Sequence, residues 1–285
     1  MNIKSKRILH TMFRISALTY ILLFVAFAIN AEAQPFRKVQ NKAFDRGEKM
    51  VFRVAFNSTL TGNVTAGKAS LEVKNTNKLF NNRSTYHVVG EGHTSGFIEL
   101  FFKVNDRLES YIDQEGLFPW QFIRRTREND YKKDELVNFR QNDKLAVSLS
   151  KIIKVPVHIQ DIVSAFYYAR TLDISALKNG EHFAMPFYLD DSVYQSKVVI
   201  KGREVVKTRM GTFNCLALRP MVATGYTFED PYPITVWVTD DEKRVPILIE
   251  SELAVGRARI ELIEYSGVLA ASTKTKPIKP VKGKK

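Results

Sequence analysis

The chain has 285 residues, a single cysteine and a formal net charge of +13. Residues 1–33 contribute +3 of this charge and the tail 269–285 contributes +6, which leaves +4 for the part between them. A charge of that size is ordinary for a soluble domain and does not indicate nucleic-acid binding by the fold. We therefore predict no nucleic acid among the partners.

The first 33 residues have the pattern of a secretory signal peptide. Basic residues precede an apolar run from Ile15 to Ile29, and Ala31 and Ala33 occupy the small positions of an A-x-A cleavage site. We predict cleavage after Ala33 and a periplasmic mature protein without a transmembrane span. The alternative is an uncleaved membrane anchor, although the run is short against the roughly 20 apolar residues that cross a bilayer. The only cysteine, Cys215, is far from the cleavage site, so we predict neither a lipoprotein nor an internal disulfide.

Residues 34–45 form a polar lead-in, and the chain then alternates apolar and polar residues. In "GEKMVFRVAFN", Met50, Phe52 and Val54 fall on one face, which is the period-two signature of a half-buried strand. About a dozen such segments follow, separated by turn residues such as Asn129-Asp130 and Met210-Gly211. They predict one mainly β domain at 46–268, a large curved antiparallel sheet that forms an open or closed barrel.

The tail 269–285 consists mostly of lysine, proline and small residues. It has almost nothing to bury, so we predict that it is disordered. Its charge would solubilise the chain or contact anionic surfaces of the cell envelope.

Sequence patterns for catalysis and metal binding are absent. The histidines His87 and His93 share a strand face but lie about 20 Å apart, too far to share a metal, and no G-x-S-x-G motif occurs. Adjacent carboxylates such as Asp190-Asp191 are flanked by turn residues, which favours hairpin tips over a glycosidase pair. We predict no catalytic residue, no metal site and no cofactor.

One segment, "VPVHIQDIVSAFYYARTLD" at 155–173, has helical spacing. Asp161 is a suitable N-cap residue. The segment predicts one substantial helix packed on the concave face of the sheet through an apolar stripe. The stripe comprises Ile159, Ile162, Val163, Phe166 and Ala169; Ser164 and Tyr168 face away, and Tyr167 lies at the border.

Arg170 falls inside this apolar stripe. In one interpretation it lies in the last helical turn and extends to water or binds Asp173. In the other it is buried and pairs with a carboxylate of the sheet or with an acidic ligand headgroup, because a buried charge requires a partner.

Aromatic residues are frequent enough to line a cavity as well as to fill a core. A large curved sheet can enclose space that its side chains do not fill. The residues predicted to contact a ligand are Arg170, Phe166, Tyr167, Trp120 and Trp237.

The motif "DIVSAFYYAR", with Asp161, Ser164, Tyr167 and Arg170 at every third position, resembles the helix of the exported domain-of-unknown-function 3108 family of Gram-negative bacteria. The opening "GEKMVFRVAFNSTLTGNVTAGKASLEV", which includes Gly67, and the closing hairpins also look like this family. The resemblance covers most of residues 46–266. It implies an exported β-rich fold, with Asp161, Ser164 and Gly67 as structural motif residues, and no established activity.

Three functions are compatible with these observations. The first is a non-catalytic periplasmic protein that binds or carries an apolar or amphiphilic envelope molecule, such as a lipid. The second is an assembly or scaffold factor that docks another envelope protein. The third is a hydrolase of envelope polysaccharide that uses a carboxylate pair.

Overall fold

The computed structural model describes residues 36–58, 62–222, 232–253 and 256–267. All the strands and helices described below lie in one compact unit, which begins at Arg37. The predicted signal peptide with its cleavage site and the predicted tail at 269–285 lie outside the described residues. Within those residues, no helix has the length and hydropathy to cross a membrane.

This compact unit is built mainly of antiparallel strands, as the alternating sequence predicts. The strands are β1 (Lys49–Ser58), β2 (Gly62–Lys74), β3 (Leu79–Phe80), β4 (Arg83–Thr94), β5 (Asn105–Asp113), β6 (Pro119–Glu128), β7 (Tyr131–Arg140), β8 (Leu145–Val147), β9 (Ile152–Lys154), β10 (His182–Ala184), β11 (Phe187–Leu189), β12 (Ser192–Tyr194), β13 (Lys197–Thr208), β14 (Gly211–Pro220), β15 (Ile234–Thr239), β16 (Pro246–Leu253) and β17 (Gly256–Ser266). The helical elements are the short 3-10 helix η1 (Gly96–Leu100) and the α-helix α2 (Ile162–Ala169).

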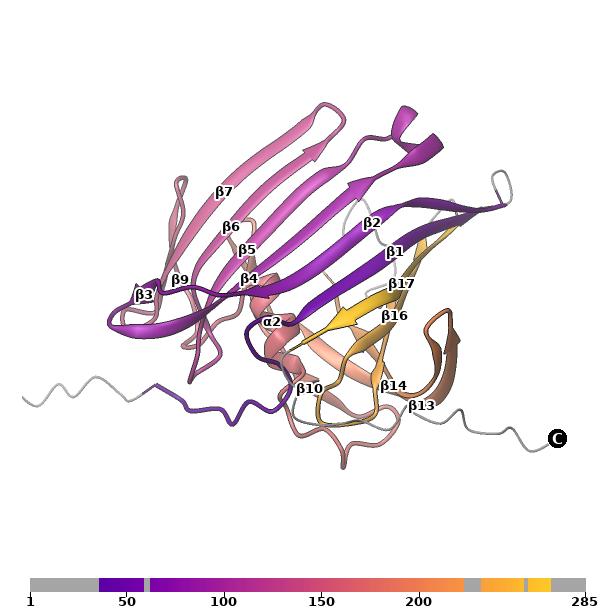
Figure 1. Cartoon of the computed structure of the whole chain (residues 1–285). Helices are drawn as coiled ribbons and strands as arrows, with labels where there is room; N and C mark the ends of the chain where they lie inside the picture. The colour runs from indigo at the N-terminus through magenta and orange to yellow at the C-terminus, as the bar shows by residue number, and fades with distance from the viewer. Residues whose placement is uncertain (1–35, 59–61, 223–231, 254–255, 268–285) are drawn as a thin grey trace, which may run out of the picture. The chain divides into compact units, whose positions relative to one another are not determined.

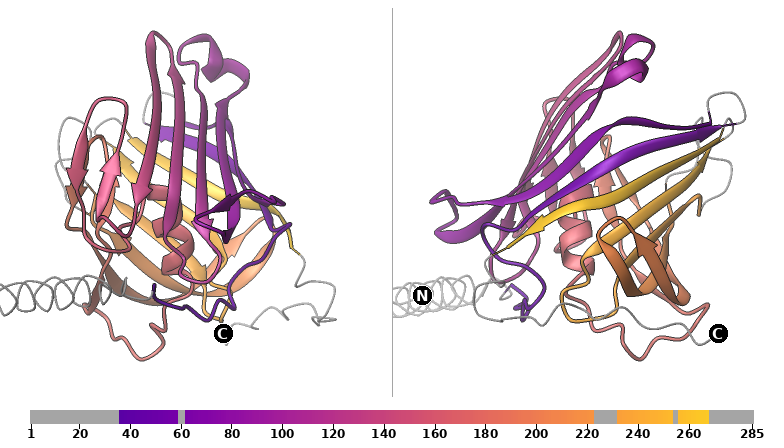
Figure 2. Two further views of the ribbon diagram at one scale, coloured as in Figure 1. Left: turned by 90° about the vertical axis from the view of Figure 1, so that its left-hand side faces the viewer. Right: turned by 45° about the vertical axis from the view of Figure 1, so that its right-hand side comes forward.

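Most strands form one large sheet, with the order β10-β13-β14-β15-β16-β17-β1-β2-β4-β5-β6-β7-β8-β9. β1 lies between β2 and β17, so the first and last strands of the domain are neighbours. In the described residues the two end strands, β9 and β10, pair only with β8 and β13. Figures 1 and 2 show two arms of the sheet that meet near β1 and β17, with α2 between them.

From Arg37 onward, the polar lead-in belongs to the compact unit that contains the sheet. Phe44 is buried, and the centroid of its ring lies 5.2 Å from that of Tyr86 and 4.7 Å from that of Tyr167. The Arg37 side chain donates to backbone carbonyls of the β5–β6 turn. This role is hard to predict from the sequence, because residues 34–45 have no regular apolar period.

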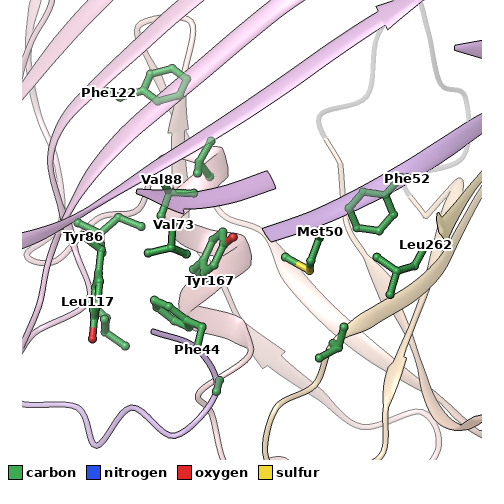
Figure 3. Packing of buried hydrophobic residues seen from close by; sticks show 14 of the residues in the cluster. Phe44, Met50, Phe52, Val73, Tyr86, Val88, Leu117, Phe122, Tyr167 and Leu262 are labelled. Atoms are coloured by element: carbon green, nitrogen blue, oxygen red, sulfur yellow. The ribbon is translucent and has the colours of Figure 1, made fainter. Parts of the chain in front are cut away.

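The buried face of α2 differs from the predicted one. Tyr167 and Ser164 are fully buried, and Figure 3 shows Tyr167 beside Phe44 in the main core. Ile162, Phe166 and Ala169 of the predicted stripe are only partly buried. Ile159 and Val163 of the stripe are buried as predicted. The prediction was wrong about Ser164 and Tyr167, because Ser164 hydrogen-bonds to Asp161 inside the core and the Tyr167 ring packs against Phe44.

Gly67 lies where β2 approaches the backbone of β4 closely. A Cβ atom added to Gly67 would lie 2.1 Å from the carbonyl oxygen of His93 and 2.9 Å from Cα of Thr94. The pairing of β1 with β2 also shifts register here, between Val54 and Ala55. The structure therefore assigns Gly67 a steric reason to be glycine.

We expect Gly67→Ala to lower the free energy of unfolding by about 1–3 kcal/mol, because the two backbones must separate. Gly92→Ala is the matched control, since a Cβ atom there meets nothing within 4 Å. Urea unfolding followed by circular dichroism measures both variants. Equal stability of the two would contradict the steric assignment.

Candidate functional site

The start of α2 is fixed by a buried carboxylate. Asp161 accepts hydrogen bonds from the backbone N–H groups of Val163 and Ser164, at 2.8 and 2.7 Å, and the Ser164 hydroxyl accepts one from the Asp161 N–H at 2.9 Å. Ser110 of β5 donates to the second carboxylate oxygen at 2.6 Å. This reciprocal cap confirms Asp161 as the N-cap residue and ties the helix to the sheet.

Complete burial raises the pKa of Asp161 from its ordinary value of 3.8 to about 6, although the hydrogen bonds from Ser110, Ser164 and the backbone oppose the rise. The folded protein therefore holds this proton more tightly than the unfolded chain. Between about pH 4 and pH 6 the folded state binds more protons at this site, so its contribution to the free energy of unfolding falls as the pH rises.

We expect Asp161→Asn to remove this pH dependence, since asparagine is also a good N-cap residue and can donate to Ser110. The stability of the native chain relative to the variant should fall by about 3 kcal/mol between pH 4 and pH 7. Urea titrations at several pH values measure the difference. A constant difference across this range would show that Asp161 titrates as it does in the unfolded chain.

The last residue of the motif, Arg170, forms a buried ion pair. Both partners are 2% exposed, and the guanidinium binds Glu48 through two hydrogen bonds, Nη1 to Oε1 at 2.7 Å and Nη2 to Oε2 at 2.9 Å. Its other donors reach the carbonyl oxygens of Ala43 and Lys243, both at 3.2 Å. Tyr265 of β17 also donates to Glu48.

This geometry decides between the two interpretations of Arg170. The side chain does not extend to water, and its carboxylate partner is Glu48, directly before β1, in place of Asp173. Burial favours the neutral form of Arg170, but the hydrogen bonds and charge of Glu48 outweigh burial and raise its pKa. With Glu48 as its carboxylate partner, Arg170 has a structural role.

We expect Arg170→Met and Glu48→Leu each to destabilise the fold by about 3–5 kcal/mol, because each leaves an uncompensated buried charge. The double variant should lose clearly less than the sum, since both charges are then gone. Urea unfolding of the four chains gives the coupling. Additive losses would mean that the two side chains do not depend on each other.

The partly exposed side of α2 borders an apolar cavity of about 480 Å³. Ile162, Ala165, Phe166 and Ala169 form its helical wall. The opposite walls come from β11, from the segment before it, from β13, from β14 with the residues after it, and from β15. Their apolar members are Met185, Phe187, Leu189, Val198, Leu218, Pro220, Met221, Val222, Ile234, Val236 and Val238. Two larger hollows, of about 650 and 750 Å³, have many charged and polar residues in their walls. The 480 Å³ cavity is therefore the better candidate for an apolar ligand.

The hairpin of β11 and β12 closes one side of this cavity. Its tip carries Asp190, which forms ion pairs with Arg124 of β6 and Lys133 of β7. The next residue, Asp191, accepts hydrogen bonds from Tyr188 and from Ser150 of the β8–β9 turn. The hairpin thus connects the cavity to the other arm of the sheet, and these carboxylates have structural partners instead of facing each other across a cleft.

The predicted ligand-contacting residues separate into two groups. Phe166 and Arg170 line the cavity. Tyr167 belongs to the core, and Trp120 is buried beside Phe118 with its indole N–H donating to Asp113. Trp237 lies between Val236 and Val238, which line the cavity, so its side chain points to the opposite face of β15; there Lys201 lies 5.3 Å from the ring centroid. The structure does not bring Tyr167, Trp120 or Trp237 to the cavity.

The sequence prediction missed the aliphatic cavity residues of the sheet, such as Val198, Leu218 and Val236. Their signal was alternation within β13–β15, which assigns them to one face. The alternation of apolar and polar residues in a strand does not show which face of the sheet a helix distant in sequence leaves partly uncovered.

The sequence matches the model of DUF3108, described as a protein of unknown function, over residues 51–263. The chain belongs to the DUF3108 family. The match confirms the family resemblance indicated by the helix motif and the flanking strands. No curated protein matches the chain.

Two solved structures are similar to this DUF3108 chain. A β-barrel-like protein of domain of unknown function DUF1849 from Brucella abortus is 9% identical, with a TM-score of 0.54, over 79% of this chain and 98% of its own. A protein with a YmcC-like fold from Bacteroides fragilis is 10% identical, with a TM-score of 0.34, over 81% of this chain and 100% of its own. The Brucella structure supports the β-barrel-like fold alone.

Proposed function

We propose that this protein binds or carries an apolar or amphiphilic molecule of the cell envelope in the cavity beside α2, without catalysing a reaction, and that it does so in the periplasm. The proposal rests on the composition of the cavity wall, which is almost entirely aliphatic and aromatic. Its volume of about 480 Å³ lies within the usual range for small-molecule sites, about 300–1,000 Å³. The predicted covering of the concave face by the helix is part of this proposal, with the ligand between them.

Arg244 supports an amphiphilic ligand in preference to a purely apolar one. It lines the cavity and donates to the carbonyl oxygen of Arg170 at 2.9 Å, at the end of α2. Among the described residues it forms no ion pair within 4.0 Å, and burial lowers its pKa although the charges of Asp173, Asp241, Asp240 and Glu242 oppose the shift. An anionic headgroup at this wall would restore favourable electrostatics to a partly desolvated guanidinium.

The polysaccharide hydrolase is less well supported. Asp190 and Asp191 are engaged at a hairpin tip, and a second adjacent pair in the sequence, Glu229-Asp230, lies outside the described residues. In a third group of adjacent carboxylates, Asp240 pairs with Arg203, Asp241 accepts hydrogen bonds from Thr239 and from the Lys243 N–H, and Glu242 pairs with Lys42. Proteins bind sugars through hydrogen bonds from polar side chains, whereas the wall of the cavity beside α2 is mainly aliphatic.

We expect Ala169→Phe to fill the cavity and weaken binding of a fluorescent fatty-acid analogue at least about tenfold, because the apolar volume for the ligand is lost. Ala176→Phe is the matched control, since Ala176 is exposed and outside the cavity wall. Fluorescence titration measures affinity, and mass spectrometry of gently purified protein identifies molecules that remain bound. Unchanged affinity in a folded Ala169→Phe variant would refute the assignment of the cavity as the site.

A further inference from the structure

Four large apolar side chains are exposed together at the connection between β4 and β5. Phe97, Leu100, Phe101 and Phe102 are 69%, 79%, 68% and 47% exposed, and η1 contributes no buried residue to the core. We call these four residues the apolar tip. Exposed apolar groups of this density mark an interaction surface, and nothing in the packing of the sheet requires them.

The backbone of the apolar tip is well ordered by internal hydrogen bonds. The N–H groups of Phe101 and Phe102 donate to the carbonyl of Ile98, at 3.0 and 2.8 Å. On either side, the Ser95 N–H donates to Ala66 and the Lys103 N–H donates to the Asn129 side chain. These bonds reduce the cost of taking the loop out of water, since unsatisfied backbone groups are expensive in an apolar phase.

The charges around the apolar tip balance. The turn carries Glu99 and Lys103, and the neighbouring β6–β7 hairpin carries Glu128, Asp130, Lys132 and Lys133, so three charges of each sign lie here. Among these six described residues only Lys133 forms an ion pair within 4.0 Å, with Asp190. The surface therefore lacks the excess of one sign that would select an acidic or basic partner, and this favours a neutral one.

We propose that the apolar tip inserts into the boundary between headgroups and acyl chains of a lipid bilayer. The four exposed side chains belong to the turn that joins the ends of β4 and β5 (Figure 2), so they form a protrusion and not a groove for a helix or strand. A protrusion of three phenylalanines and a leucine on a hydrogen-bonded loop fits an apolar layer that moulds around it. A protein partner would need a matching pocket.

The apolar tip lies at the same end of the sheet as part of the cavity wall. Ile234 of the wall is in register with Ser251, and the row continues through Ala258 and Phe56 to Val64 of β2. β2 in turn binds the connection that holds the apolar tip, through Ala66. Insertion would bring this end of the cavity towards the bilayer; this step alone rests on the proposed function.

The experiment places an environment-sensitive fluorophore on the apolar tip through Glu99→Cys, which keeps all four apolar residues. The native Cys215 is buried, and burial raises its pKa to about 12, so it is protected from labelling. We expect zwitterionic phosphatidylcholine vesicles to shift the emission to the blue and to shield the label from an aqueous quencher. A label introduced by Leu79→Cys should not respond, because Leu79 lies in β3, which pairs with the opposite end of β4.

Adding Phe97→Ser and Phe101→Ser should raise the lipid concentration needed for the response at least about tenfold, because most of the inserted apolar surface is lost. Leu79→Ser with Val205→Ser removes two exposed apolar side chains elsewhere and should leave the response unchanged. High salt should also have little effect, since the charges balance. A silent label at position 99, or a response that survives the two serines, would overturn the proposal.

Two further outcomes are distinct. If the serine variant loses one stoichiometric protein partner and vesicles give no response, the occupant is a protein and the bilayer proposal is wrong. The Ala169→Phe variant should respond to vesicles like the native chain, so insertion and cavity binding fail independently.

Discussion

The packing of this domain depends on the buried pair of Arg170 and Glu48. The guanidinium sits where the end of α2, the lead-in, the start of β1 and the β15–β16 hairpin converge, and it hydrogen-bonds to the last three. Tyr265 brings β17 to the same carboxylate. A charge in this position is tolerated only because its donors are engaged, so the pair requires these elements to be correctly placed at once and orients α2 relative to both arms of the sheet.

That requirement also explains the unusual orientation of α2. Asp161, Ser164 and Arg170 make their hydrogen bonds inside the core, to Ser110, to the helix's own backbone and to Glu48 respectively. Four of the apolar residues of α2, Ile162, Ala165, Phe166 and Ala169, are left on the side that the core does not fill, where they meet the aliphatic face of β13–β15. The cavity is therefore a consequence of the same interactions that hold the helix in place.

Local patterns predicted much of the fold, whereas the candidate site depends on tertiary contacts. Period-two alternation and turn residues such as Asn129, which has a φ of 49°, indicated the strands and hairpins. Asp161 was recognisable as a cap because the cap is a contact within a few residues. The partner of Arg170 is 122 residues away, and neither this distance nor the inward direction of Ser164 and Tyr167 is visible from spacing. Amphipathic periodicity assumes that polar groups seek water, whereas here Ser164 and Arg170 hydrogen-bond inside the core and the Tyr167 hydroxyl is buried without a hydrogen-bond partner.

The adjacency of β1 and β17 has a consequence for how the chain is made. Glu48 and Tyr265, which share a hydrogen bond, are 217 residues apart, so the central ladder joins the beginning of the domain to its end. In a nascent chain that stops before residue 256, the β1 backbone groups that pair with β17 have no partner strand. Such unpaired strand edges can pair with other chains. Non-local pairing of this kind also slows folding. The domain can complete its core only after synthesis of the last strand, which gives any chaperone or translocation machinery a long interval in which the chain is still unfolded.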